Sequence, residues 1–208
     1  MFKKEEITGI LIATIILAFT ISLLQSWNLF LYTFIAVFLI IMINILGKKI
    51  AAYYLDLDIE SKIWEFKRYG IRAHWKLEKP FPIGAFIPIF LKVFSFGYLN
   101  WMSCLAFKVK PEVYRTARRH GVFAFTHATE FHTALIAAAG ITANLIFSVI
   151  GYMINQPQFA AMNIYLAFNN CLPLSELDGN KLFFGSRSLW YALIIITGIA
   201  LLFAVYAI

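Results

Sequence analysis

The sequence NCLPLSELDG, at residues 170–179, decides how the rest of the chain is interpreted. It places Pro173, Asp178 and Gly179 at the end of an apolar segment, in a chain of 208 residues that is 61% hydrophobic and 14% charged. A soluble domain is typically about half apolar and about a quarter charged, so this composition indicates a membrane protein. Because an ionisable side chain at membrane depth is costly, Asp178 is a candidate functional residue. It could bind a metal, pair with a cation or lie at the water boundary.

The positive charge is distributed as in a membrane protein rather than as in a nucleic-acid-binding protein. The net charge is +7, and the lysines and arginines lie between apolar segments, where cytoplasmic loops carry them. We therefore predict one membrane domain over residues 1–208, surrounded by the lipid bilayer of the cell membrane, with no nucleic-acid partner. Cys104 and Cys171 follow no CxxC spacing and are expected to be buried thiols. The apolar run after Lys4 is too long for a cleavable signal peptide.

Five apolar segments predict helices that cross the bilayer, at about residues 7–25, 28–47, 132–154, 160–173 and 188–207. A helix needs roughly 20 residues to cross about 30 Å of hydrocarbon. Lysines flank both open ends of the first pair, so the amino end is predicted to be cytoplasmic and the carboxyl end to be outside. The segments 48–81, 108–131 and 174–187 are predicted to be cytoplasmic loops.

Two segments between these spans have a different pattern. Residues 57–80 contain two short runs of charged, aromatic and apolar residues around Tyr69-Gly70, which favours a small β-hairpin near the membrane surface. Residues 82–107 are apolar but interrupted by prolines, a glycine and polar residues. Since a basic segment follows them, they are predicted to enter and return on the same side, as a re-entrant segment or helical hairpin. The predicted fold is an all-α polytopic membrane protein that carries this small β-hairpin.

The order of these features resembles the site-2 protease family, which comprises intramembrane zinc metalloproteases. Residues 170–179 are similar to the family's NLLPxxPLDG element, which they match at Asn170, Leu172, Pro173, Leu177, Asp178 and Gly179. Residues 136–144 resemble its AGPxxN element at Ala139, Gly140 and Asn144, with Ile141 in place of proline. The family places HExxH on an earlier span before a β-hairpin, where this chain has Asn44-Ile45-Leu46-Gly47-Lys48. The resemblance covers most of the chain after residue 40 and implies a site-2 protease-like helical bundle.

The resemblance also implies a metal site whose chemistry is missing from this chain. In HExxH two histidines on one helical face bind zinc and the glutamate is the general base, and the family's aspartate is the third ligand. At these positions Asn44 is a poor zinc ligand, Ile45 cannot accept a proton and Lys48 brings a positive charge. Asp178 is the only ligand-type residue retained, so no metal or other cofactor is expected. The one histidine cluster, His127 to His132, has the wrong spacing for a zinc pair and is expected to be a solvated basic loop.

Lys48 lies four residues after Asn44 on the same helical face, which leads to a specific hypothesis. Its ammonium is predicted to replace the metal and to pair with Asp178 inside the bundle, because buried membrane charges usually pair with one another. The alternative is that Lys48 reaches the cytoplasmic headgroups from the end of its span.

Four further residues are predicted to line the former cleft: Gly140, Asn144, Asn170 and Pro173. Each also has a structural interpretation. Gly140 would be a helix-packing position, Asn144 would hydrogen-bond a neighbouring helix, and Asn170 and Pro173 would shape a helix break.

The sequence therefore predicts a catalytically inactive pseudoprotease that binds a transmembrane client or is a scaffold subunit of a membrane complex. The edge of the hairpin at residues 57–80 would add a client strand. One alternative is an active intramembrane metalloprotease with non-standard zinc ligands. A second is a small transporter or channel subunit, which would need a continuous polar path through spans that are largely uncharged.

Overall fold

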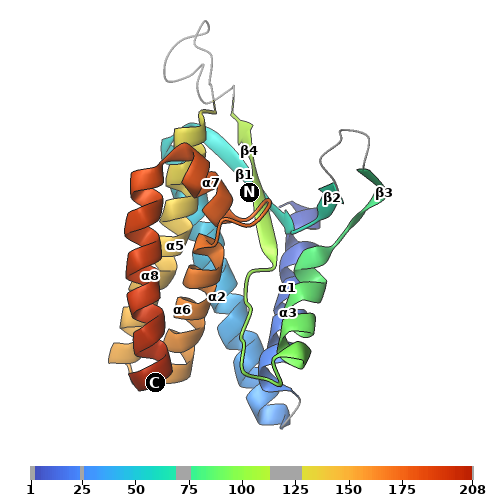
Figure 1. Ribbon diagram of the computed structural model, residues 1–208, viewed down its shortest axis with the longest axis vertical. Coiled ribbons are helices and arrows are strands. Elements are labelled where there is room, and N and C mark those ends of the chain that lie inside the picture. Colours follow the sequence, from blue (N-terminus) through green and yellow to red (C-terminus); the bar gives the residue numbers. More distant parts are fainter. Residues whose placement is uncertain (1–2, 24–25, 69–75, 113–127, 208) are drawn as a thin grey trace, which may run out of the picture.

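The computed structural model describes residues 3–23, 26–68, 76–112 and 128–207. Within these ranges the chain forms seven helices and four strands (Figure 1). In chain order they are α1 (Lys4–Ser22), α2 (Trp27–Tyr54), β1 (Leu57–Ile63), β2 (Phe66–Arg68), β3 (Lys76–Phe81), α3 (Ile83–Phe94), β4 (Leu105–Pro111), α5 (Glu130–Met153), α6 (Pro157–Cys171), α7 (Asp178–Gly185) and α8 (Arg187–Ala207).

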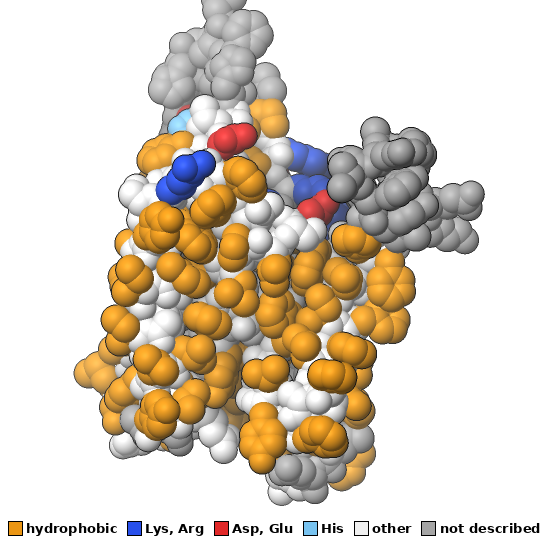
Figure 2. All heavy atoms as spheres, in the orientation of Figure 1, with side chains coloured by type: hydrophobic (Ala, Val, Ile, Leu, Met, Phe, Trp, Pro, Cys, Tyr) orange, Lys and Arg blue, Asp and Glu red, His pale blue; other side chains and the backbone are white. Residues whose placement is uncertain are grey.

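Four of these helices, α1, α2, α5 and α8, are long and apolar enough to cross a membrane. They correspond to the predicted spans at residues 7–25, 28–47, 132–154 and 188–207. On the face drawn in Figure 2, hydrophobic side chains cover the helical part, and charged side chains gather at one end. The chain begins at that end and finishes at the opposite one (Figure 1).

The fifth predicted span, residues 160–173, forms the shorter helix α6. Its 15 residues rise about 22 Å at about 1.5 Å per residue, less than the roughly 30 Å of a hydrocarbon core. It packs against α5 and α8 and buries three asparagines, Asn163, Asn169 and Asn170. The side chains of Asn169 and Asn170 bond to the segment before β4. The helix is therefore an internal element of the bundle.

Helix α2 continues to Tyr54, beyond the predicted end of its span at residue 47. The sequence places Lys48 and Lys49 at the end of a span, whereas the structure places both inside the helix because each has an acidic partner. Lys49 Nζ lies 2.8 Å from Glu6 Oε2, and Lys48 pairs with Asp178. The predicted loop at residues 48–81 consequently begins only after Tyr54.

Two short antiparallel sheets replace the single predicted hairpin. β2 pairs with β3 across the predicted turn at Tyr69-Gly70, which itself lies outside the described residues. β1 pairs instead with β4, in a register that runs from Leu57↔Pro111 to Ile63↔Leu105. Strand β4 thus crosses the boundary between the predicted re-entrant segment and the predicted loop at residues 108–131.

The segment between Gly84 and Cys104 leaves the sheets and returns to the same residue. The Trp64 carbonyl accepts a hydrogen bond from Gly84 N–H at 2.9 Å, and Trp64 N–H donates to the Cys104 carbonyl at 2.9 Å. Between these points α3 packs along α1, and the chain then runs back toward β4 (Figure 1). A Cβ on Gly84 would overlap the Cys104 carbonyl oxygen, so only glycine fits where the two limbs meet. The chain thus runs out and back between these residues; that it enters a membrane and returns on the same side stays a prediction for residues 82–107.

The β1–β4 sheet lies over one end of the helix bundle and contributes to its core. Leu57, Ile59 and Phe107 are buried in one cluster with Ala137 of α5 and Leu182 of α7. Because successive strand residues point to opposite faces, Glu60 and Lys108 lie on the other face of the sheet. The sheet therefore places the Phe107 ring directly over the interior of the bundle.

Candidate functional site

Small residues bring α2 and α5 close together at the level of Lys48. A Cβ on Gly47 would lie 2.9 Å from the Ala139 carbonyl oxygen. A Cβ on Gly140 would lie 2.6 Å from Lys48 Cε and 2.8 Å from Lys48 Cγ. Such contacts are too short for real side chains, so the glycines permit the close crossing. Gly140 in particular leaves the space that the aliphatic stem of Lys48 fills.

Gly179 determines where Asp178 lies. Helix α7 begins at Asp178 and packs so closely on the end of α6 that a Cβ on Gly179 would overlap the carbonyl oxygens of Cys171 and Leu172. Trp190 of α8 donates its Nε1–H to the Cys171 carbonyl at 3.0 Å, which satisfies an acceptor that the helix end leaves without a partner. Asp178 is therefore held in the first turn of α7, where the backbone amides favour negative charge.

Lys48 and Asp178 form the ion pair that the sequence predicts. Lys48 Nζ lies 2.5 Å from Asp178 Oδ2, and the two side chains are 5% and 0% exposed. Within the described residues neither carboxylate oxygen has a partner with hydrogen-bond geometry, so the contact is a close charge pair rather than a directed hydrogen bond. The alternative, in which Lys48 reaches the headgroups, does not hold. Removing either partner would leave an uncompensated buried charge.

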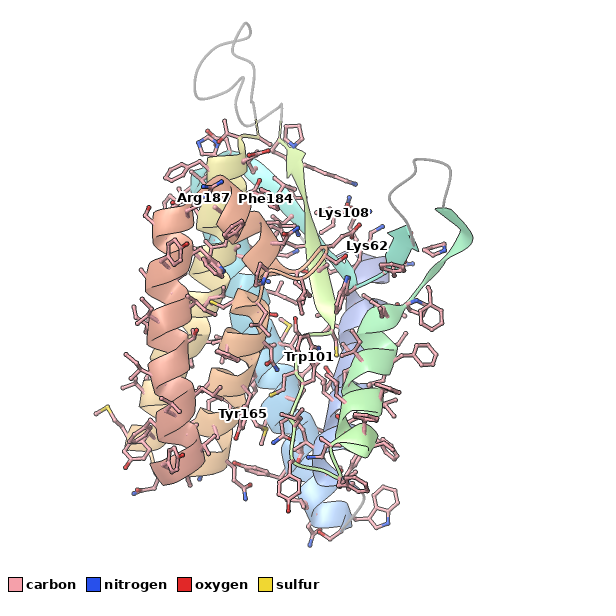
Figure 3. All side chains as sticks on the ribbon, viewed as in Figure 1. Lys62, Trp101, Lys108, Tyr165, Phe184 and Arg187 are labelled. Atoms are coloured by element: carbon pink, nitrogen blue, oxygen red, sulfur yellow. The ribbon has the colours of Figure 1, made fainter. Side chains whose placement is uncertain are left out.

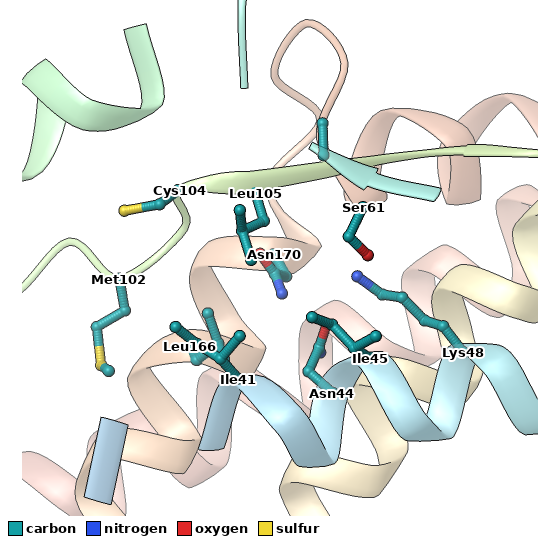
Figure 4. Close-up of a pocket in the computed structure, with 11 residues that line it drawn as sticks. Ile41, Asn44, Ile45, Lys48, Ser61, Met102, Cys104, Leu105, Leu166 and Asn170 are labelled. Atoms are coloured by element: carbon teal, nitrogen blue, oxygen red, sulfur yellow. The ribbon is translucent and has the colours of Figure 1, made fainter. Parts of the chain in front are cut away.

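A small cavity adjoins the pair (Figure 4). The Lys48 ammonium and the Ser61 side chain approach one another across it, and Asn170 enters from α6. Its volume is about 20 Å³, which is room for about one water molecule. Asn44 and Ile45 also line it, and Asn44 Nδ2 has no hydrogen-bond partner within the described part of the chain.

The site also contains Phe107 of β4 and Lys181 of α7, two residues that the sequence pattern does not indicate. Lys48 Nζ lies 5.0 Å and Lys181 Nζ 3.7 Å from the centroid of the Phe107 ring, whose face attracts cations. Lys181 Nζ also donates a hydrogen bond to the Phe107 carbonyl oxygen. Burial lowers the pKa of Lys181 to about 8, which the nearby Asp178 carboxylate opposes and the Lys48 charge reinforces. The one available signal is that Lys181 lies three residues after Asp178, on the same helical face.

The outer edge of β4 lies beside this site. In an antiparallel ladder the backbone groups of successive residues point alternately toward and away from the partner strand. Trp64 N–H bonds to the Cys104 carbonyl and Glu112 N–H to the Asp56 carbonyl. The backbone groups of the even-numbered residues in both strands therefore point toward the partner strand. Phe107 and Val109 therefore direct their backbone groups outward.

That outer edge borders a groove of about 460 Å³. Among the described residues the groove is lined by side chains of β4, α5, α7 and their flanking segments: Phe107, Lys108, Val109, Ala128, Thr133, Glu176 and Lys181. Lys108 lies at the charged end of the molecule, together with Lys62 and Arg187 (Figure 3). At the opposite edge of the sheet Ser61 N–H of β1 donates to Glu6 Oε1 at 3.2 Å, as Lys181 does to the Phe107 carbonyl on β4. The predicted docking edge on the hairpin at residues 57–80 is thus occupied at Ser61.

The residues around Asp178 do not fit a zinc ion. The ammonium of Lys48, itself a cation, lies 2.5 Å from the carboxylate oxygen that would be the ligand, and Asn44 and Ile45 supply neither a second ligand nor a base. Within the described ranges no three His, Cys, Asp or Glu side chains are grouped to hold a metal ion. His127, from the cluster considered in the sequence, lies outside the described residues.

The four predicted cleft residues have different surroundings. Gly140 packs against Lys48, and Asn170 lines the small cavity while its Oδ1 accepts a hydrogen bond from Ser103 Oγ at 2.5 Å. Asn144 is buried in α5, and neither polar atom of its side chain has a hydrogen-bond partner in the described structure, so the predicted interhelical bond is not formed. Pro173 is exposed in the turn before α7. Only Gly140 and Asn170 therefore belong to the site.

Comparisons of the chain with protein-family models, with curated proteins and with solved structures find no match.

Proposed function

We propose that this chain is a site-2 protease-like protein of the cell membrane, without intact zinc-protease chemistry, that binds a transmembrane client or is a scaffold subunit of a membrane complex. The amino end and the basic loops would be cytoplasmic, as the positive-inside bias predicts. The observation that carries the proposal is the buried contact between Lys48 and Asp178. A cation-bearing side chain lies where the resemblance implies a metal, at the close crossing of α2 and α5 and next to the β1–β4 sheet.

The position of the β4 edge supports a binding role. The outward backbone groups of Phe107 and Val109 border a groove next to the ion pair, and an extended segment can add to such an edge through main-chain hydrogen bonds. We place binding at the edge of β4 rather than at that of β1 because the groove borders β4; each edge has one side-chain contact, from Lys181 at Phe107 and from Glu6 at Ser61. The water-sized cavity beside Lys48 would stay closed while a client lies in the groove.

Photocrosslinking tests the binding role directly. A photoreactive residue is placed at Val109 in the groove and, as a control, at Ile195, which is 59% exposed on α8. The probe is a single-span reporter with a ten-residue extended segment on its cytoplasmic side. We expect crosslinking from Val109 but not from Ile195, with the reporter remaining uncut. Equal crosslinking from both positions would refute client binding at the edge of β4.

Zinc content and cleavage test the catalytic part of the proposal. Elemental analysis of the purified protein is expected to give much less than one zinc per chain. Stoichiometric zinc, or reporter cleavage that Asp178→Ala abolishes, would establish instead an active metalloprotease with non-standard ligands.

A further inference from the structure

Lys181 occupies the hydrogen-bond acceptor that a client strand needs. Its ammonium donates to the outward carbonyl of Phe107 and lies 3.7 Å from the ring centroid of the same residue. An added strand donates its N–H groups to such edge carbonyls. A segment that pairs with β4 at Phe107 must therefore displace Lys181.

Displacement takes the Phe107 carbonyl away from Lys181. Among the described residues, Lys108, Lys181 and the acidic Glu176 line the groove, Glu130 lines the adjoining pocket together with Lys181, and the buried Asp178 lies against Lys48. An ammonium that loses its acceptor in a partly buried place carries a desolvation cost that only a new acceptor removes. Glu176 and Glu130 are both exposed, so water already satisfies them and they gain little from receiving Lys181.

We propose that the groove selects extended segments that carry an acidic side chain facing Lys181. The proposal rests on strand addition at the β4 edge, and it names the chemical class of the client. A client N–H donates a hydrogen bond to the Phe107 carbonyl. The displaced ammonium donates to the client carboxylate in a charge-assisted hydrogen bond, which is stronger than a neutral one. Lys108, at the rim of the same groove, favours the same sign of charge during encounter. A neutral segment gains the backbone bond but leaves the ammonium unpaired.

Peptide binding to the purified full chain in detergent micelles tests this selection. The probes are fluorescent ten-residue strand-forming peptides in which a single Glu is moved through the positions, each with a matched Gln peptide. Fluorescence anisotropy is measured for the wild type, for Lys181→Met, and for Lys108→Met as a control that removes an equal charge from the rim. Lys181→Met is expected to fold, because methionine keeps the apolar stem over the Phe107 ring, and its tryptophan fluorescence is measured alongside.

In the wild type we expect at least one Glu position to bind about tenfold more tightly than its Gln counterpart, which corresponds to about 1.4 kcal/mol. Lys181→Met should erase this preference while binding the Gln peptides as well as, or better than, the wild type, because the Phe107 carbonyl is then free. Lys108→Met should weaken all acidic peptides slightly and keep the preferred position. Binding without any Glu preference, or a preference that persists in Lys181→Met, would overturn acidic selection and leave strand addition standing. Absence of binding to both the wild type and Lys181→Met would overturn strand addition itself.

Discussion

Replacing Lys48 by methionine isolates the buried charge pair. Methionine has a similar length and no charge, so the variant leaves the fully buried Asp178 without its cation. Breaking a buried pair by removing one partner typically costs about 3–5 kcal/mol. We expect the free energy of unfolding to fall by about 3–5 kcal/mol at pH 7.

A second substitution tests whether the loss comes from the unpaired carboxylate. Adding Asp178→Asn to Lys48→Met removes the unpaired carboxylate. It should recover at least half of the lost free energy of unfolding at pH 7, because removing both partners costs much less than removing one.

Chemical unfolding in detergent micelles at pH 7, followed by tryptophan fluorescence, measures both variants. The control is Lys62→Met, which removes a lysine from an exposed pair whose side chains are 41% and 85% exposed, and which should change the free energy of unfolding by less than about 1 kcal/mol. If Lys48→Met were no more destabilising than Lys62→Met, or if adding Asp178→Asn recovered none of the loss, the charge-pair reasoning would be wrong.

Three further predictions follow from the packing around the pair. Gly179→Ala should destabilise the protein by about 3 kcal/mol or more, since its Cβ meets two backbone carbonyls that cannot move independently; the midpoint of chemical unfolding measures this loss, and a midpoint equal to that of the wild type would refute it. Gly140→Ala should cost about 1–3 kcal/mol because Lys48 must shift, and the cost should shrink in the Lys48→Ala background, which lacks both contacting atoms, as a double-mutant cycle detects. Because the folded-state pKa of Lys181 is about 8, below its ordinary 10.5, the unfolded chain binds more protons between these values; the free energy of unfolding of the wild type should therefore rise with pH over that window relative to Lys181→Met. A flat difference between the two proteins would contradict the burial of Lys181.

The parts of the site that could be predicted are those encoded by local spacing. Asn44 and Lys48 share a helical face because they are four residues apart, and Asp178 and Gly179 lie in a short contiguous motif. The ion pair then follows from the general need of a buried charge for a partner. Four of the five predicted spans likewise follow from uninterrupted apolar runs.

The parts that could not be predicted depend on contacts between distant segments. β4 has no distinctive local pattern, and its partner β1 lies on the far side of the Gly84–Cys104 segment. The roles of Phe107 and Lys181 depend in turn on β4, so the local sequence does not predict them either. Helix α2 is longer than the predicted span for a related reason. Lysines mark the end of a span when they reach water, and here Lys49 finds Glu6 instead.

The two ends of the Gly84–Cys104 segment meet at Trp64, and this meeting sets the direction in which the following helices run. Because Gly84 and Cys104 bond to the two backbone groups of the same residue, the segment between them makes no net passage from one end of the bundle to the other. The chain therefore leaves this segment at the end of the molecule at which it entered it, and α5 starts at the same end at which α2 finishes (Figure 1). Insertions or deletions between residues 85 and 103 can alter the depth of the excursion without inverting any helix that follows.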